Sequence, residues 1–313
     1  MSLKYTMEVM ELLDDPNANG EMVVDLFTEF SHVEASYQTV SGDSGSTDFI
    51  KILVKGAEGK STGGNAPSLG IVGRLGGLGA RPSRIGFVSD GDGAAAAITT
   101  ALKLSLMAEK GDRLPGDVYI TTHICPDAPT IPHEPVVFMG SPVDIFTMNQ
   151  YEVLPEMEAV LSIDTTKGNK VFNHRGIALS PTVKQGYVLK FSDDLIRIME
   201  MTTGDLPVTF AVTTQDITPY GNDVYHINSI LQPAVTTDAP VVGLAITART
   251  AVPGCGTGAS HEVDVAQAVR FSIEVAKEFT RGEIEFHDQV EFQHLVNLYG
   301  SMKKLQTLGS TAK

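Results

Sequence analysis

Short runs of apolar and β-branched residues alternate with longer amphipathic stretches along the whole chain. Apolar runs of about four to eight residues predict buried strands, and apolar positions that recur every three or four residues predict helices. The predicted strands are Val33–Val40, Phe49–Val54, Leu69–Val72, Arg84–Val88, Asp117–His123, Ala159–Ile163, Val208–Val212 and Val241–Ile246. The predicted helices are Met7–Leu13, Glu21–Phe30, Ala94–Glu109, one that begins at Ser141-Pro142, Ser192–Met201, Asp223–Leu231, one capped by Asp264, and Phe286–Tyr299.

The order of these elements indicates the fold class. Strands and helices that alternate along a chain form a mostly parallel sheet with helices on both faces. We therefore expect a three-layer α/β/α fold with a central, mostly parallel mixed sheet. The chain has no internal repeat, low-complexity block or linker, so we expect residues 1–313 to form a single domain.

Composition narrows the class of protein further. Hydrophobic residues make up 42% of the chain and charged residues 19%, which suffices for a full core. No apolar window reaches the roughly 18 residues of a membrane-spanning helix, and the first residues lack the pattern of a signal peptide. The two cysteines cannot build a disulfide framework, so we expect a reducing, cytoplasmic location.

The net charge of −15 argues against nucleic acid and membranes as partners, because binding to phosphate groups needs a basic surface. The ordinary interpretation of this charge is solubility, and the sharper one is a carboxylate-rich pocket for a cation. We expect a small-molecule or peptide ligand and a homo-oligomer.

Polar residues follow several of the predicted strands, at the edge where ligands bind in parallel sheets. They are Asp90, Asp92, His123, Cys125, Asp127, Asp164, Arg249, Cys255 and His261. Carboxylates and an imidazole that converge from different strands are what a two-metal hydrolytic site requires. Each also has a structural alternative: Asp90 to Gly93 as a helix-capping turn, Asp164 as an Asx turn, and His261 as a helix cap.

The successive blocks of the chain resemble those of the zinc aminopeptidase and deacylase superfamily. "FVSDGDGAAAAITTALKL" is similar to the block with the bridging aspartate, "GDVYITTHICPD" to the block with two successive glutamates, "AVLSIDTT" to the block with the next aspartate ligand, and "YGNDVYHI" to a Gly-Thr-Asp segment. The resemblance implies zinc or manganese on Asp90, Asp127, Asp164 and His261, and it places a substrate-binding role on Asp223. The spacing leaves no room for a large lid domain.

Two departures from the superfamily make this an atypical branch. The block "GIVGRLGGLG" lacks the family's first metal-binding histidine, and Pro126 stands at the position of the catalytic glutamate. Glu134 is the alternative catalytic base, and His123 or His133 the alternative ligand. In place of the histidine, Arg74 in the glycine-rich run Gly73–Gly79 could pair with a ligand carboxylate.

Three functions follow from these residues, and whether the protein is an enzyme stays open. The first is a metal-dependent hydrolase of amide or peptide-like bonds with a rearranged site and Glu134 as base. The second is a non-catalytic, metal-free relative that binds an amino acid or small peptide, or serves as a subunit of an assembly. The third is a metal-free enzyme that uses Cys125 or Cys255, both in loops expected at the site.

Overall fold

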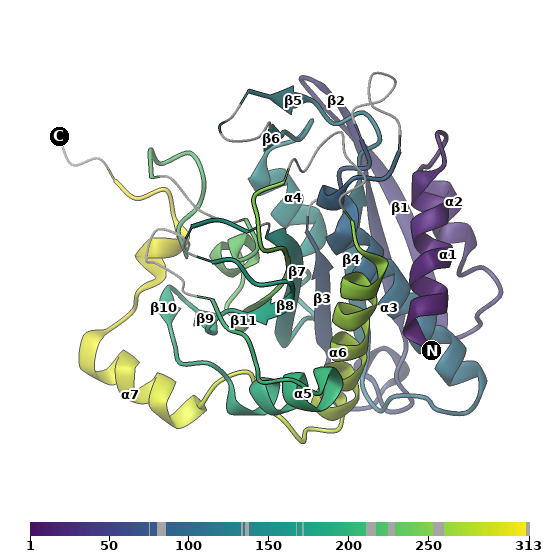
Figure 1. The fold of residues 1–313 in the computed structure, drawn as a ribbon. Helices are drawn as coiled ribbons and strands as arrows, with labels where there is room; N and C mark the ends of the chain where they lie inside the picture. Colours follow the sequence, from purple (N-terminus) through teal and green to yellow (C-terminus); the bar gives the residue numbers. More distant parts are fainter. Residues whose placement is uncertain are drawn as a thin grey trace.

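The computed structural model describes residues 1–74, 76–79, 86–132, 134, 138–166, 168–170, 172–210, 217–224, 229–252 and 260–310. Within them, a nine-stranded mixed sheet has the strand order β1-β2-β4-β3-β7-β11-β9-β10, with β8 also paired to β11 (Figure 1). The strands are β1 (Val33–Gly42), β2 (Gly45–Val54), β3 (Leu69–Gly73), β4 (Val118–Ile124), β7 (Ala159–Thr166), β8 (Gly176–Leu179), β9 (Val183–Lys184), β10 (Tyr187–Val188) and β11 (Val241–Thr247).

The centre of the sheet is parallel and its flanks are antiparallel. Strand β3 runs parallel to β4 and β7, and β7 runs parallel to β11. Strands β1 and β2 form an antiparallel hairpin that pairs with β4. All of β3, β4 and β11 is buried, as expected for strands that are covered on both faces. A separate two-stranded sheet consists of β5 (Thr130–Ile131) and β6 (Phe138–Met139).

Four long helices cover one face of the sheet. They are α1 (Ser2–Asp14), α3 (Asp92–Glu109), α5 (Asp193–Thr203) and α6 (Glu262–Thr280), with α3 and α6 packed against each other and against the strands. The run Ala94–Ala97 is fully buried, because small side chains let α3 lie close to the sheet. The main apolar core lies in this interface.

The opposite face is covered by shorter elements. Helix α4 (Ile145–Glu152) packs on β2, β4 and the short 3₁₀ segment η4 (Gln232–Val235), and its Ile145 and Met148 form an apolar cluster with Phe49 and Val143. The remaining elements are α2 (Gly20–Asp25), α7 (Gln289–Tyr299) and the 3₁₀ segments η1 (Lys60–Thr62), η2 (Ser89–Gly91) and η5 (Lys303–Gln306). Helices on both faces of a mixed sheet confirm the predicted α/β class.

Several predicted boundaries differ from the observed ones. Asp144, and not Ser141, caps α4, because its carboxylate accepts hydrogen bonds from the amides of Phe146 and Thr147. Helix α6 begins at Glu262, two residues before the predicted cap. No strand precedes Asp90 among the described residues 86–88, and the helix predicted for Asp223–Leu231 is a turn at its described start and end. Among the described residues, no helix has the length and apolarity needed to cross a membrane.

Candidate functional site

The carboxyl ends of β3, β4, β7 and β11 meet at one edge of the sheet, and polar residues occupy it. Gly73 at the end of β3 is paired with Thr122 of β4 and Ile163 of β7, and Asp164 is paired with Ala245 of β11. Arg74, His123 and Asp164 therefore stand at adjacent positions along the edge. They share this edge because parallel strands end on the same side of a sheet.

A close contact between glycines presses the start of α3 against this edge. A Cβ atom on Gly73 would lie 2.6 Å from the carbonyl oxygen of Gly93, and one on Gly93 would lie 2.4 Å from that of Arg74. Only glycine fits both positions, because real Cβ atoms do not approach backbone so closely. The contact brings Asp90 and Asp92, at the start of α3, to the ends of β3 and β7.

The glycine-rich run after β3 packs on the segment that follows β4. The amide of Gly76 donates to Nε2 of His123 at 3.3 Å, and the amide of Leu78 donates to the Cys125 carbonyl at 3.0 Å. A Cβ on Gly76 would overlap the His123 carbonyl oxygen, at 1.5 Å. These two amides bind protein acceptors, so the glycines serve close packing here and not the approach of an anionic ligand.

Arg74 is completely buried on the α4 side of the sheet. Its Nε lies 3.3 Å from Oε2 of Glu152, its Nη2 donates to Asn149, and its Nη1 lies 3.6 Å from the Met148 sulfur. The other oxygen of Glu152 is bonded to Nδ1 of His123. The contact from the Gly76 amide to Nε2 and the contact from Nδ1 to Glu152 together match the tautomer of His123 that carries its proton on Nδ1. We call Arg74, Glu152 and His123 the buried charge cluster.

Asp164 is a second buried carboxyl group, with 2% of its surface exposed. Oδ2 accepts from the Ser229 hydroxyl at 2.6 Å, and Oδ1 accepts from the Thr165 amide at 2.7 Å. Burial raises the pKa of Asp164 to about 7, the nearby charge of Asp90 adds to the rise, and the hydrogen bonds and the Arg74 charge oppose it. Asp90 and Arg74 thus both lie close enough to Asp164 for their charges to affect it.

A small cavity of about 10 Å³, room for one water molecule, lies between Asp90, His123 and Cys125. Cys125 is buried among Val88, Ala128 and Met139. Burial raises the pKa of the Cys125 thiol to about 12, so the thiol stays protonated at neutral pH. This environment favours packing over nucleophilic chemistry.

The other predicted site residues that the structure describes are exposed and not buried with this cluster. Asp127 and Glu134 are exposed on the segment after β4. Asp223 is exposed in a turn with a φ of 60°. His261 is exposed at the N-cap of α6. Cys255 and His133 fall outside the described residues, so their predicted roles stay predictions.

The described residues do not fit the two-metal site that the resemblance implies. Among them, no three His, Cys, Asp or Glu side chains come together as metal ligands. Both ring nitrogens of His123 and both carboxyl oxygens of Asp164 already have protein partners. A guanidinium supplies the positive charge at this edge.

A pocket of about 330 Å³ lies beyond the end of β11, lined by Arg175, Arg249, His261, Ala248, Thr250 and Val252. Its three basic side chains come from the segment before β8, the segment after β11 and the start of α6. Arg175 is paired with Asp264 at 3.3 Å. Arg249 is exposed and forms no ion pair within the described part of the chain. We call this the cationic pocket.

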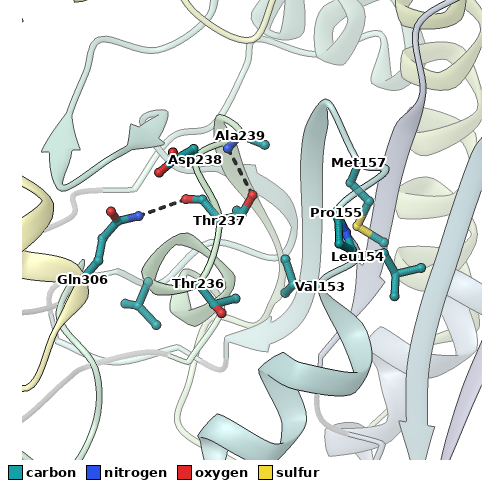
Figure 2. A pocket seen from close by; sticks show the side chains of 10 residues that line it. Val153, Leu154, Pro155, Met157, Thr236, Thr237, Asp238, Ala239 and Gln306 are labelled. Carbon is teal, nitrogen blue, oxygen red and sulfur yellow. Dashed lines mark hydrogen bonds between the residues drawn. The ribbon is translucent and has the colours of Figure 1, made fainter.

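A larger pocket of about 670 Å³ lies at the opposite edge, where β7 and β11 begin (Figure 2). One wall consists of Val153, Leu154, Pro155 and Met157, and the facing wall consists of Val235–Ala239 with Gln306 beside Thr237. The Gln306 amide donates to the carbonyls of Ala234 and Thr237, both at 2.9 Å. Ligands of open α/β sheets bind at the carboxyl edge, so position argues against this pocket as the functional site.

Sequence reasoning missed Glu152, Asn149 and Arg175. Asn149 and Glu152 are three residues apart on α4 and therefore share a face of the helix. Two polar residues on a face next to Met148 were the available signal for a buried polar network. Arg175 carried no such signal, since its place beside α6 depends on how β8 pairs with β11.

Known proteins resemble this chain at the level of fold. A cytosol aminopeptidase from Coxiella burnetii superposes with a TM-score of 0.51 at 13% identity, over 88% of this chain and 68% of that one. A mutant of tomato leucine aminopeptidase has a TM-score of 0.48 at 12% identity, over 87% of this chain and 60% of its own. No curated protein matches the sequence. The model of a family described as "Protein of unknown function (DUF1177)" matches residues 38–309.

Proposed function

Because the family model matches most of its length, the chain belongs to the family DUF1177, and we propose that it is a metal-independent binding protein on an aminopeptidase-like fold. Its ligand is an amino acid or a small peptide. The protein binds this ligand without hydrolysing it.

The observation that carries this proposal is the buried guanidinium of Arg74. It lies with no exposed surface at the edge where the resemblance implies metal ions, and Glu152 compensates its charge. A guanidinium has hydrogen-bond donors and no acceptor, so Arg74 cannot serve as the metal ligand that the resemblance expects from this block. The cavity between Asp90, His123 and Cys125 has room for about one water molecule.

A metal-dependent hydrolase of amide or peptide-like bonds is the second candidate. One observation favours it: Asp90 and Asp164 are close enough to interact at the edge, and the pKa of Asp164 is raised to about 7 by burial. A carboxyl group that titrates near neutral pH suits general acid–base work. Such a protein would need metal ligands beyond those that the described residues offer.

Metal analysis of the purified protein separates the two candidates. A binding protein should contain no stoichiometric zinc or manganese, and a chelator should leave its melting temperature unchanged. It should be stabilised by amino acids or dipeptides without cleaving dipeptides or aminoacyl amides, because a ligand that binds only the folded state raises stability by mass action. Stoichiometric metal with peptide cleavage that Asp164→Asn abolishes would establish the hydrolase.

Assembly and location complete the proposal. We propose that the protein is a cytoplasmic homo-oligomer, as the sequence predicted. Light scattering behind size-exclusion chromatography measures the assembly. A monomeric mass across the accessible concentration range would refute it.

A further inference from the structure

We infer that the cationic pocket formed by Arg175, Arg249 and His261 is a binding site for a small oxyanion. For the proposed function, that oxyanion is the carboxylate of the amino acid or peptide, so the ligand class rests on that proposal. The pocket itself is inferred from its charge, volume and position alone.

The position of the pocket is the first argument. It follows β11, a central parallel strand, at the edge where ligands of α/β sheets bind. The segment before β8 meets there the segment after β11 and the start of α6, which are more than 70 residues further along the chain. Gly168 lets the segment before β8 lie close to the segment after β11, because a Cβ on it would lie 2.2 Å from the Ala248 carbonyl oxygen.

The charge of the pocket is the second argument. The whole chain has a net charge of −15, yet two arginines and a histidine line this one cavity. Asp264 compensates Arg175, whereas Arg249 has no carboxylate partner in the described part of the chain. An arginine left unpaired beside a second arginine in an acidic protein can bind an anion through a two-pronged contact.

The start of α6 strengthens the site. The N-cap residue of this 19-residue helix, His261, makes no side-chain capping hydrogen bond with the described residues. The first amides of a long helix and its dipole favour negative charge. The acidic residues of the first turn, Glu262 and Asp264, oppose this effect, so the arginines must supply most of the attraction.

The volume of the pocket is the third argument. About 330 Å³ is at the lower end of the range for small-molecule sites. An amino acid or dipeptide fits this volume, and Ala248 and Val252 give it an apolar wall. Carboxylate and phosphate share the chemistry that the arginines recognise, so the experiment must separate them.

Isothermal titration of the full chain with three probes tests the site. N-acetyl-L-alanine carries the carboxylate, N-acetyl-L-alanine amide lacks it, and inorganic phosphate is the alternative oxyanion. We expect the acid to bind and the amide not to bind. Arg249→Met should lower the affinity for N-acetyl-L-alanine by about tenfold or more, as expected when a charged hydrogen bond is lost. Arg281→Met, at the other end of α6, is the matched control and should leave the affinity unchanged.

Each outcome decides one point. If phosphate binds more tightly than the acid and also depends on Arg249, the oxyanion site is supported, and its ligand is a phosphate and not a carboxylate. Equal binding of acid and amide, an unchanged affinity in Arg249→Met, or no binding of the acid or phosphate overturns the site. Metal-dependent cleavage with Arg249-dependent anion binding would refute the proposed function and leave the site standing. If a peptide binds with the same affinity in Arg249→Met as in wild type, the proposed function stands and the anion site at Arg249 is refuted.

Discussion

At the scale of single residues, the buried ion pair between Arg74 and Glu152 predicts how the free energy of unfolding changes when one partner is removed. Neither side chain has more than 1% of its surface exposed. Removing one partner of such a pair leaves an uncompensated charge in the interior, which costs about 3–5 kcal/mol. Arg74→Met should therefore lower the free energy of unfolding in urea by this amount.

A double variant shows that charge, and not volume, causes the loss. Glu152→Gln in the Arg74→Met background removes the stranded charge and keeps an acceptor for His123, so it should recover at least about 1 kcal/mol. Arg197→Met breaks the exposed pair with Glu278 and should cost about 1 kcal/mol or less. If the double variant is no more stable than Arg74→Met, the charge argument is wrong.

Asp164 predicts a dependence of stability on pH. Burial raises its pKa from 3.8 to about 7, so the folded state binds a proton that the unfolded state has released between these values. Stability must therefore fall as pH rises through this window, by about 1.4 kcal/mol per pH unit and about 4 kcal/mol in all. Asp164→Asn cannot ionise, so above pH 7 it should be more stable than wild type.

Urea unfolding of both proteins from pH 4 to pH 8 measures this difference. It should grow with pH and level off above pH 7. Ser229→Ala is the companion variant, because it removes a hydrogen bond that lowers the pKa of Asp164. In this variant, the pH above which stability stops falling should therefore be higher. A difference between wild type and Asp164→Asn that stays constant over this range would contradict a buried, titrating carboxyl group.

At the scale of elements, the start of α3 depends on the contact between Gly73 and Gly93. Alanine within a helix is usually more stable than glycine by about 1 kcal/mol. Gly93→Ala should instead lower the free energy of unfolding by about 2–3 kcal/mol. The added Cβ would lie 2.4 Å from the Arg74 carbonyl oxygen and 2.6 Å from that of Ile163. Thermal unfolding measures the loss.

The control for this prediction is a glycine in open space. Gly282→Ala adds a Cβ that meets nothing within 4 Å, and only its φ of 71° opposes alanine, at a cost of about 1 kcal/mol. A Gly93→Ala protein that is as stable as wild type would mean that α3 can shift away from the sheet.

The elements that could be predicted from sequence are those with strong local patterns. The apolar runs of β3, β4, β7 and β11 and the alanine-rich α3 match the predicted ranges closely. Asp144 was missed as the cap of α4 because Ser141, followed by Pro142, offers the same local signal three residues earlier. Local patterns identify an element well, and they locate its end only where one capping residue stands alone.

At the scale of the whole molecule, the edge of the sheet could be predicted and the chemistry at it could not. Strand order brings the carboxyl ends of β3, β7 and β11, and with them Arg74 and Asp164, to one edge. Whether a side chain there points into the core, as Arg74 does, or into solvent, as Asp127 does, depends on packing between distant segments. The pairing of Arg74 with Glu152 could not be predicted from local sequence, because the two residues are 78 positions apart in the chain.

The net charge of −15 leads to the last prediction. Like charges on a folded chain repel one another, and salt screens them, with a screening length that falls from about 30 Å at 0.01 M to about 10 Å at 0.1 M. The melting temperature at pH 8 should therefore rise with sodium chloride over this range. At pH 5, close to the isoelectric point of 4.9, the rise should disappear. Chloride bound in the cationic pocket would also stabilise the protein, but only while Arg249 is present. A rise at pH 8 that persists in Arg249→Met is therefore screening, and a rise that is lost in this variant would contradict the charge argument.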